Sequence, residues 1–405
     1  MAWQPSAVEL LDDAERRRRL AVRHALAGAA RRDGPVAAAR SVVALHGTDP
    51  ASIVLSARAR CASMSADDVG AALHERRELI RVMAMRRTIW VVPADLVAAA
   101  VAGPGARVAG TERKRLVADV ETHGLHANGD RWLATARRQV LTALADDAEL
   151  SMDEIRSRSP ALVGSYRQGI GKRWDSEVPI APRVLTWMWA DGAIVRSGND
   201  GSWRSSRPLW AAADRWIHTD RRSRDVDGAT GWTELVRRWL AAFGPGTERD
   251  IVWWLGATKA IVGASLGALD AVGVALSDGT TGWVLPDDLD LTAEPGPWGA
   301  LLPALDPTTM GWKSRDWYLG PHAPDLVDSA GNAGPTIWWN GRIVGGWHQS
   351  EDGAVGMALL DDIGADGIAV LEDHAGQLEE FLGGRRVLMR FPSPLFQRST
   401  GRHRS

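Results

Sequence analysis

The sequence predicts an α+β protein in which three tandem winged-helix domains precede a β-rich C-terminal domain. A helix, a capped second helix, a third helix and a short strand pair with a tight turn recur in this order three times before about residue 286. Beyond that residue the helical spacing of apolar side chains stops, and short alternating runs rich in Gly, Pro, Asp and Trp indicate strands. The length of 405 residues is sufficient for several such domains.

The first domain, residues 1–125, follows this order least regularly. Its expected elements are a helix at 16–28, a polar loop and helix at 46–60, a helix at 64–75 capped by Ser65, and a strand at 86–93. The loop begins with His46-Gly47-Thr48-Asp49-Pro50. A side-chain oxygen ahead of a proline is typical of a helix start, because the oxygen accepts from a free amide and proline fits the first helical position. The same loop holds an imidazole, a hydroxyl and an acid beside a positive helix end, where water or an anion could bind.

The second and third domains, residues 126–225 and 226–285, show the order more clearly. The second is expected to contain a helix at 131–148, a helix that begins with the capping box of Ser151 and Glu154, a helix at 180–190, and a hairpin about Gly198–Gly201. The third is expected to contain a helix at 230–244, a helix capped by Thr247 and Asp250, a helix at 264–276, and a turn at Asp278 and Gly279.

The β-rich domain is expected to span 286–397, and a disordered tail is expected at 398–405. Asn340 and Gly341 lie between alternating apolar residues at 336–347, which predicts a hairpin with a two-residue turn. A further strand is expected at 384–391.

Charge is distributed unevenly along the chain. Residues 1–225 hold 35 Lys and Arg against 27 Asp and Glu, a net charge of +8, whereas the remaining residues hold 13 against 23, a net charge of −10. Most of the cations are arginines, whose planar groups bind phosphates with two parallel donors. We therefore expect an anionic partner to bind the first two domains.

Several classes of function are disfavoured by what the sequence lacks. It contains no Walker loop, no GxGxxG after a strand, no HExxH, no CxxC and no GxSxG, so we expect no cofactor, no metal and no acyl-enzyme serine. The single cysteine, Cys61, excludes an internal disulfide and a multi-thiolate metal cluster, in agreement with a reducing compartment. No apolar run reaches the roughly 18 residues that cross a bilayer, and the N-terminus lacks the order of a signal peptide. We therefore expect a cytoplasmic protein without a membrane partner.

Four motifs resemble, in their order along the chain, those of the AlkZ/YcaQ family of bacterial DNA glycosylases: RRRRLAVRHAL, LHGTDP, MRRTIWVVP and LLPALDPTTMGWKSRDWYLGP. The resemblance extends over nearly the whole chain. It implies three tandem winged helices and a C-terminal β-barrel-like domain. It also implies double-stranded DNA with alkylated purines as the partner, removal of bulky or crosslinking N7-alkylguanines as the activity, and a role in self-resistance to alkylating antibiotics.

The resemblance places the catalytic residues in the loop at 46–49. Family glycosylases typically carry Gln-apolar-Gln, or Gln-apolar-Asp in another branch, and His46, Gly47 and Thr48 stand at these three positions. Both catalytic glutamines are therefore replaced. His46 could orient or deprotonate water, and Thr48 could donate and accept one hydrogen bond in place of an amide. Asp49 could stabilise the developing sugar cation, so we expect His46, Thr48 and Asp49 to be catalytic.

The expected reaction is hydrolysis by a monofunctional glycosylase. An N7-alkylated guanine already carries positive charge and leaves easily, so a positioned water and a stabilised oxocarbenium-like sugar would suffice. No lysine lies within 42–60 and the whole chain has only four, at 114, 172, 259 and 313, which disfavours Schiff-base chemistry.

We expect arginines beside the catalytic loop and on the strand pairs, or wings, of the first two domains to contact DNA phosphates. Such contacts supply affinity without sequence information. These arginines are Arg58, Arg60, Arg86, Arg87, Arg204 and Arg207. Asn340 and Arg342 of the predicted hairpin are expected to probe a groove or a lesion.

Two other functions remain open. The missing glutamines favour a catalytically silent relative that binds DNA or a lesion as a sensor or regulator. The 20 tryptophans also allow a cleft that holds a planar, drug-like molecule. The sequence indicates no protein partner.

Overall fold

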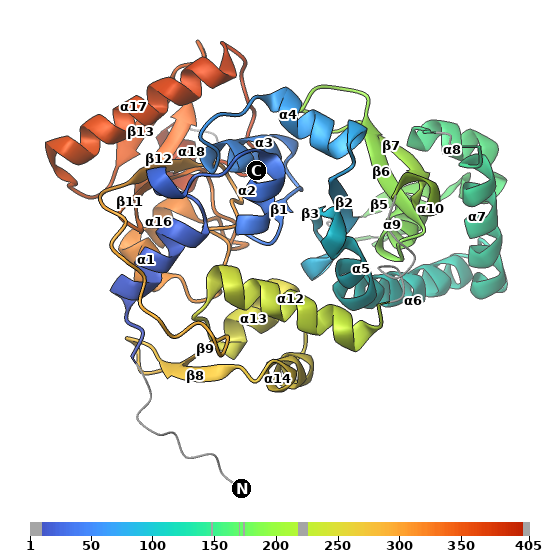
Figure 1. The fold of residues 1–405 in the computed structure, drawn as a ribbon. Helices are drawn as coiled ribbons and strands as arrows, with labels where there is room; N and C mark the ends of the chain where they lie inside the picture. The colour runs from blue at the N-terminus through green and yellow to red at the C-terminus, as the bar shows by residue number, and fades with distance from the viewer. Residues whose placement is uncertain (1–9, 147–148, 170, 173–174, 218–225, 400–405) are drawn as a thin grey trace, which may run out of the picture.

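The structure is a computed structural model that describes residues 10–146, 149–169, 171–172, 175–217 and 226–399. It is a mixed α/β fold in which helices surround small sheets (Figure 1), and the five sheets of the described residues are all antiparallel.

The N-terminal part is built around a three-stranded sheet with the order β1-β3-β2. Its elements are α1 (Asp13–Arg23), α2 (Pro35–Ser41), β1 (Leu45–His46), α3 (Pro50–Ala59), α4 (Ala66–Gly70), β2 (Leu79–Met83), β3 (Ile89–Pro93) and α5 (Val97–Ala100). The central strand β3 is fully buried at Trp90, Val91 and Val92. Since β1 pairs with this central strand, the loop that follows β1 starts from a fixed position.

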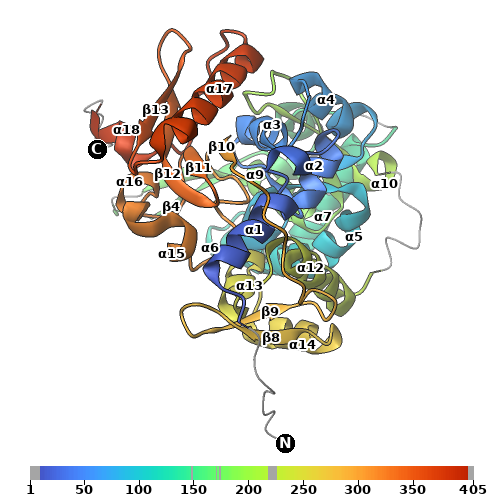
Figure 2. The same cartoon turned by 60° about the vertical axis from the view of Figure 1, so that its left-hand side comes forward.

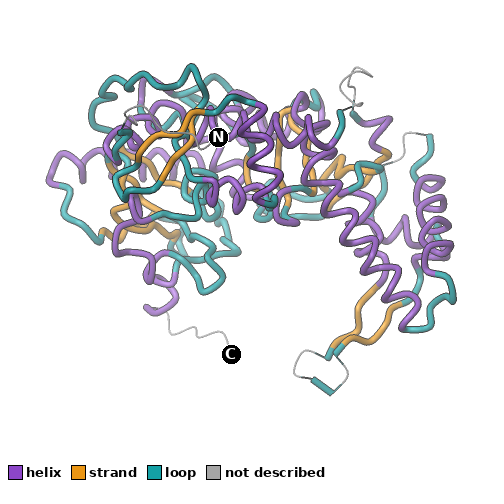
Figure 3. The backbone as a smooth tube through the Cα atoms, turned by 90° about the horizontal axis from the view of Figure 1, so that it is seen from below, coloured by secondary structure: helices purple, strands orange, loops and turns teal. Residues whose placement is uncertain are grey.

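The next segment forms an arm that projects from the body, with the β4–β5 hairpin at its far end (Figure 3). Its elements are α6 (Ala106–Thr122), α7 (Gly129–Ala143), α8 (Met152–Arg158), β4 (Ser165–Gln168), β5 (Ser176–Pro179), α9 (Ile180–Ala190), β6 (Ile194–Asn199), β7 (Pro208–Ala212) and α10 (Ala213–Trp216). Helices α6, α7 and α9 share an apolar core in which Leu116, Val140 and Val184 are fully buried.

A compact helical group follows the arm. Its elements are α12 (Gly228–Phe243), α13 (Glu248–Leu255), α14 (Lys259–Ala268), β8 (Val272–Ala275) and β9 (Thr281–Val284). Among the described helices, none alone is long and apolar enough to cross a membrane, although α13 and α14 would qualify as a pair bent by 114°.

The C-terminal part contains an open sheet of four strands with the order β10-β11-β12-β13, not a barrel. Its elements are β10 (Gly299–Leu302), α15 (Asp316–Leu319), α16 (Ala323–Leu326), β11 (Thr336–Trp339), β12 (Arg342–Gln349), β13 (Val355–Leu359), α17 (Gly364–Leu382) and α18 (Pro394–Ser399). Helix α17 lies across this sheet, as Figure 2 shows from the side. In the described residues β10 and β13 do not pair with each other, so the expected closed, barrel-like arrangement is wrong.

Other expectations fail at particular elements. The helix expected at 264–276 ends at Ala268, and its last part is strand β8. The strand expected at 384–391 is irregular, and the preceding 19 residues form α17, whose buried face consists of Gly367, Leu371, Ala375, Leu378 and Leu382. In the predicted tail, residues 398–399 belong to α18, and residues 400–405 lie outside the described residues.

Local signals in the sequence are confirmed. The capping boxes form at Ser151 with Glu154 and at Thr247 with Asp250. The hairpin turn forms at Asn340 and Gly341, whose φ angles of 46° and 80° are those a two-residue hairpin turn requires. The domain boundaries stay a prediction.

Helix α3 is fixed to the C-terminal part by a buried ion pair. The Arg60 guanidinium donates to the two carboxylate oxygens of Asp306 at 2.9 and 2.7 Å, and both side chains are 0% exposed. Arg60 also donates to the Thr308 hydroxyl, which contacts His24 Nδ1 at 2.9 Å. Ser52 on the same helix donates to the Ala304 carbonyl at 2.8 Å. Two of the four family-like motifs, those that contain His24 and Asp306, therefore meet α3 and its C-cap residue Arg60 at one buried polar network.

We expect Arg60→Met to lower the free energy of unfolding by about 3–5 kcal/mol, because the Asp306 carboxylate would stay buried without its partner. Urea denaturation followed by tryptophan fluorescence measures this change. The matched control is Arg40→Met, which removes an ion pair with Asp95 in which both side chains are 44% exposed and should cost less than about 1 kcal/mol. Equally small losses in the two variants would contradict the role assigned to the buried pair.

Candidate active site

The loop at 45–49 is held at both ends by backbone geometry. On one side β1 pairs with β3, and the Gly47 amide donates to the Ile89 carbonyl at 2.8 Å. On the other side Pro50 begins α3. A β-carbon at Gly47 would lie 2.8 Å from the Ile89 side chain, so glycine allows the loop to approach β3 this closely. The pairing of β1 with β3 and the start of α3 at Pro50 together fix the positions of His46, Thr48 and Asp49.

His46 lies in the core beneath the loop. Its side chain is 4% exposed, and its ring contacts Trp90 edge-on with 4.9 Å between centroids. Burial, and secondarily the positive charge of Arg86, lowers the pKa of His46 to about 3. The neutral ring accepts at Nδ1 from the Thr48 amide at 3.4 Å, so the proton is on Nε2. An imidazole with so low a pKa is a poor base near neutral pH, and this disfavours water deprotonation by His46.

Asp49 is the N-cap of α3, as the Asp-Pro pattern predicts. Its carboxylate accepts from the Ala51 amide and from the Arg390 amide, both at 3.3 Å. The residue is 1% exposed, and burial raises the pKa of its carboxyl. Asp49 thus joins the loop to the segment that follows α17, and it does so from a buried position.

Thr48 is the member of the predicted triad that lines an open cleft of ≈ 580 Å³. Its hydroxyl oxygen is buried without a hydrogen-bond partner among the described residues. The cleft is formed by the loop, the start of α8, α9, the β6–β7 hairpin and Arg390. A polar oxygen without a partner at the wall of a cleft is available to a water molecule or a substrate after a rotation of its side chain.

A model of the DNA glycosylase AlkZ-like family matches residues 39–381. The chain belongs to this family. The solved structure of Streptomyces sahachiroi DNA glycosylase AlkZ is similar with a TM-score of 0.70 and 17% identity, over 93% of this chain and 98% of that one. That likeness shows a shared fold, and the comparison with curated proteins gives no significant match.

In this AlkZ-like chain the cleft has a basic side that the sequence analysis did not assign. Arg196 on β6 lies against two indoles that contact each other, with its guanidinium carbon 4.3 Å from the Trp189 ring centre and 5.2 Å from that of Trp210. Arg390 lines the same cleft. Arg196 belongs to the predicted wing, so its basic character was visible in the sequence. No local pattern could have placed Arg390 beside Thr48, since the two are 342 positions apart.

The predicted DNA-contacting arginines occupy different environments. Arg207 is exposed and lines the cleft beside Thr48. Arg204 is exposed and donates to the Arg386 carbonyl at 2.8 Å. Arg87 is exposed and pairs with Glu112 at 2.8 Å. These three remain accessible to a phosphate.

Three others are packed against protein groups. Arg60 is 0% exposed and bound to Asp306, so its position does not fit the predicted phosphate contact. Arg58 lies over the Phe381 ring at 5.3 Å, and Arg86 lies over the Trp253 ring at 4.1 Å. Burial lowers the pKa of Arg86 to about 10, with a smaller contribution from Arg315. The side chains of Arg58 and Arg86 are partly exposed, so only their exposed atoms could contact DNA.

The hairpin residues Asn340 and Arg342 lie away from the Thr48 cleft. Asn340 accepts from the Trp298 amide at 2.9 Å, and Gly341 packs so closely on α1 that a β-carbon would lie 2.5 Å from Arg17. Arg342 is exposed. The hairpin tip therefore packs on α1, and the side chains of Asn340 and Arg342 are both exposed there.

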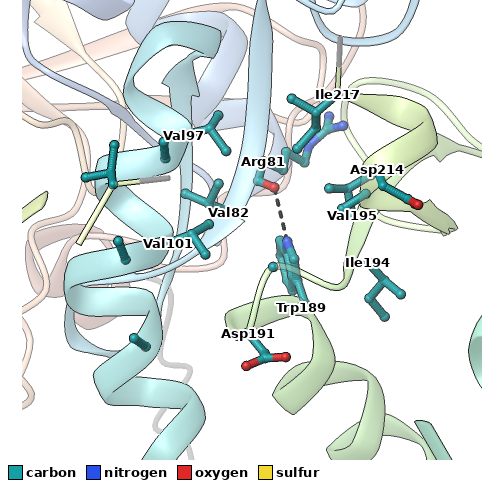
Figure 4. Close-up of a pocket in the computed structure, with 16 residues that line it drawn as sticks. Arg81, Val82, Val97, Val101, Trp189, Asp191, Ile194, Val195, Asp214 and Ile217 are labelled. Atoms are coloured by element: carbon teal, nitrogen blue, oxygen red, sulfur yellow. Dashed lines mark hydrogen bonds between the residues drawn. The ribbon is translucent and has the colours of Figure 1, made fainter. Parts of the chain in front are cut away.

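A second cavity, of ≈ 400 Å³, lies between β2, α5 and the β6 strand (Figure 4). Most of the residues that line it are aliphatic. The Trp189 indole forms part of one wall and donates to the Arg81 carbonyl at 3.1 Å. Among the described residues, no group of three His, Cys, Asp or Glu side chains could hold a metal. The Thr48 cleft is therefore the candidate active site.

We expect stability to fall as the pH falls from 6.5 towards 3, in part because of His46. In this window the unfolded chain binds a proton at the imidazole and the folded chain does not, so the free energy of unfolding decreases by up to about 1.4 kcal/mol per pH unit for this side chain. Urea denaturation of His46→Gln at pH 6.5 and 4.5 should show a smaller decrease than in the wild type. His126→Gln, at an exposed histidine, is the matched control, and identical decreases in all three proteins would contradict the assignment.

Proposed function

We propose that the chain is a monofunctional DNA glycosylase that hydrolyses the bond between sugar and base at bulky or crosslinking N7-alkylguanines in double-stranded DNA. The observation that supports this most is the position of Thr48: it belongs to the loop at which the resemblance places the catalytic motif, and it lines an arginine-bearing cleft. The helix-and-hairpin units would act as three tandem winged helices that hold the duplex. Self-resistance to an alkylating antibiotic is the proposed biological role.

The proposed roles follow from the burial of the three side chains. Thr48 holds the attacking water through its hydroxyl. His46 keeps the Thr48 backbone in place by accepting from its amide, and it stays neutral during the reaction. Asp49 anchors the loop and places a carboxylate behind it, where its field favours the positive charge that develops on the sugar. Water is the nucleophile because N7-alkylation has already made guanine a good leaving group.

A second candidate function is a catalytically silent sensor that binds damaged DNA. The burial of His46 and Asp49 favours it, because neither side chain reaches the cleft surface in this conformation. The two candidates share the DNA-binding surface and differ only in base release.

The deciding measurement is release of the modified base from duplex DNA that carries N7-alkylguanine. We expect release above the rate of spontaneous depurination. We expect Thr48→Val to reduce the rate about 10- to 100-fold, because the loss of one hydrogen bond to the reacting water costs about 1–3 kcal/mol. Thr186→Val, at another threonine of the same cleft, is the matched control and should keep the wild-type rate. Wild-type rates in both variants would remove Thr48 from the mechanism.

The double variant His46→Gln with Thr48→Gln separates the two candidates. For an active glycosylase we expect release by the wild type and no more than a modest gain in the variant. A wild type that binds duplex DNA and releases no base, together with a variant that does release it, would instead establish the silent sensor.

A further inference from the structure

Three guanidinium groups converge behind the catalytic loop. Arg81 on β2 and Arg196 on β6 line one small cavity of ≈ 30 Å³ together with Gly47, and Arg196 and Arg390 line the larger cleft together with Thr48. Arg196 thus stands on the wall that the two spaces share. The segments that supply these arginines come from three distant parts of the chain, so the cluster exists only in the folded protein.

None of the three arginines forms an ion pair in the part of the chain that the structure describes, although the Glu149 carboxylate lies next to Gly198 on the small cavity. Among the described residues, no carboxylate lies within 4.0 Å of the guanidinium nitrogens of Arg81, Arg196 or Arg390. The two acids on the larger cleft are Asp153, which pairs with Arg156 at 3.2 Å, and Asp200. Burial and the nearby charges of Arg81 and Arg390 lower the pKa of Arg196 to about 10, which still leaves it charged near neutral pH.

Arg196 is also held in one orientation. Its guanidinium packs against both the Trp189 and the Trp210 ring, and its Nε atom is buried without a hydrogen-bond partner. Burying a charged donor without a partner costs free energy unless an anion completes the site. A fixed planar fork beside two further cations is suited to a phosphate, which accepts two parallel hydrogen bonds.

We propose that Arg196, assisted by Arg81 and Arg390, binds a backbone phosphate of DNA next to the nucleotide whose base faces Thr48. The Ser205 and Ser206 residues on the small cavity supply hydroxyl donors for the same phosphate. The site positions the sugar of the target nucleotide against Thr48, and it rests on the proposed function for the choice of DNA as the source of the phosphate.

The first test is the salt dependence of binding to a short unmodified duplex, measured by fluorescence anisotropy. We expect Arg196→Gln to raise Kd about 10-fold and to reduce the slope of log K against log salt by about 0.9, the value for one lost phosphate contact. Arg196→Lys should keep the slope, since the charge remains.

Arg390→Gln should also reduce the slope of log K against log salt. Because the Arg390 side chain is exposed, this variant avoids a folding defect. Arg40→Gln, at an arginine already paired with Asp95, is the control.

The second test locates the phosphate. A methylphosphonate removes the charge of one phosphate beside an abasic-site analogue in the duplex. We expect it to weaken wild-type binding about 10-fold and to have no further effect on Arg196→Gln, because the two changes remove the same contact. Additive effects at every phosphate near the analogue would overturn the assignment.

These results are independent of base release. If the wild type releases base while Arg196→Gln and Arg390→Gln keep the wild-type slope, the phosphate site is wrong and the glycosylase function stands. If the slope changes in a protein that releases no base, the phosphate site stands and the glycosylase function is wrong. If inorganic phosphate raises the unfolding temperature of the wild type but not of Arg196→Gln while the slopes stay equal, the site binds free phosphate and the proposal for DNA is overturned.

Discussion

The buried ion pair between Arg60 and Asp306 is the constraint on which the arrangement of the candidate site depends. Arg60 ends the helix that follows the catalytic loop, and Asp306 begins the polar turn after the first strand of the C-terminal sheet. A charged pair in the core is stabilised by further hydrogen bonds, and Arg60 also donates to the Ser56 carbonyl and the Thr308 hydroxyl, which holds the two segments in one relative position. The loop at 46–49 is thereby placed at the junction of the N-terminal and C-terminal parts.

This junction explains why the site is assembled from distant segments. Asp49 receives a hydrogen bond from the Arg390 backbone, and the same contact brings the Arg390 side chain to the edge of the cleft. Arg196 reaches the cleft from the opposite side through the β6–β7 hairpin. Thr48 therefore lines a cleft together with arginines that no continuous stretch of the sequence contains. A cation-rich wall beside one polar oxygen is an arrangement suited to DNA chemistry without a cofactor.

The replacement of the family's glutamines has a physical consequence in this chain. A glutamine is uncharged at every pH and could reach a cleft from the position of His46, whereas the imidazole packs on Trp90 and loses its basicity through burial. Of His46, Thr48 and Asp49, Thr48 is the residue that lines the cleft, and Gly47 allows the loop to lie close to β3. The loop lies where the resemblance places the catalytic motif, whereas His46 and Asp49 mainly hold the loop in its position.

The sequence by itself determined the features that depend on near neighbours. The caps at Ser151, Thr247 and Asp49 and the turn at Asn340 were predictable because each is decided within a few residues. The resemblance of four short motifs was sufficient to predict the family. Only the tertiary structure decided that Arg60 is a core residue, that β8 replaces the end of an expected helix and that α17 covers an open sheet. Burial and strand pairing depend on partners outside the local segment, 246 positions away for Arg60 and Asp306, and a local pattern of polarity carries no record of those partners.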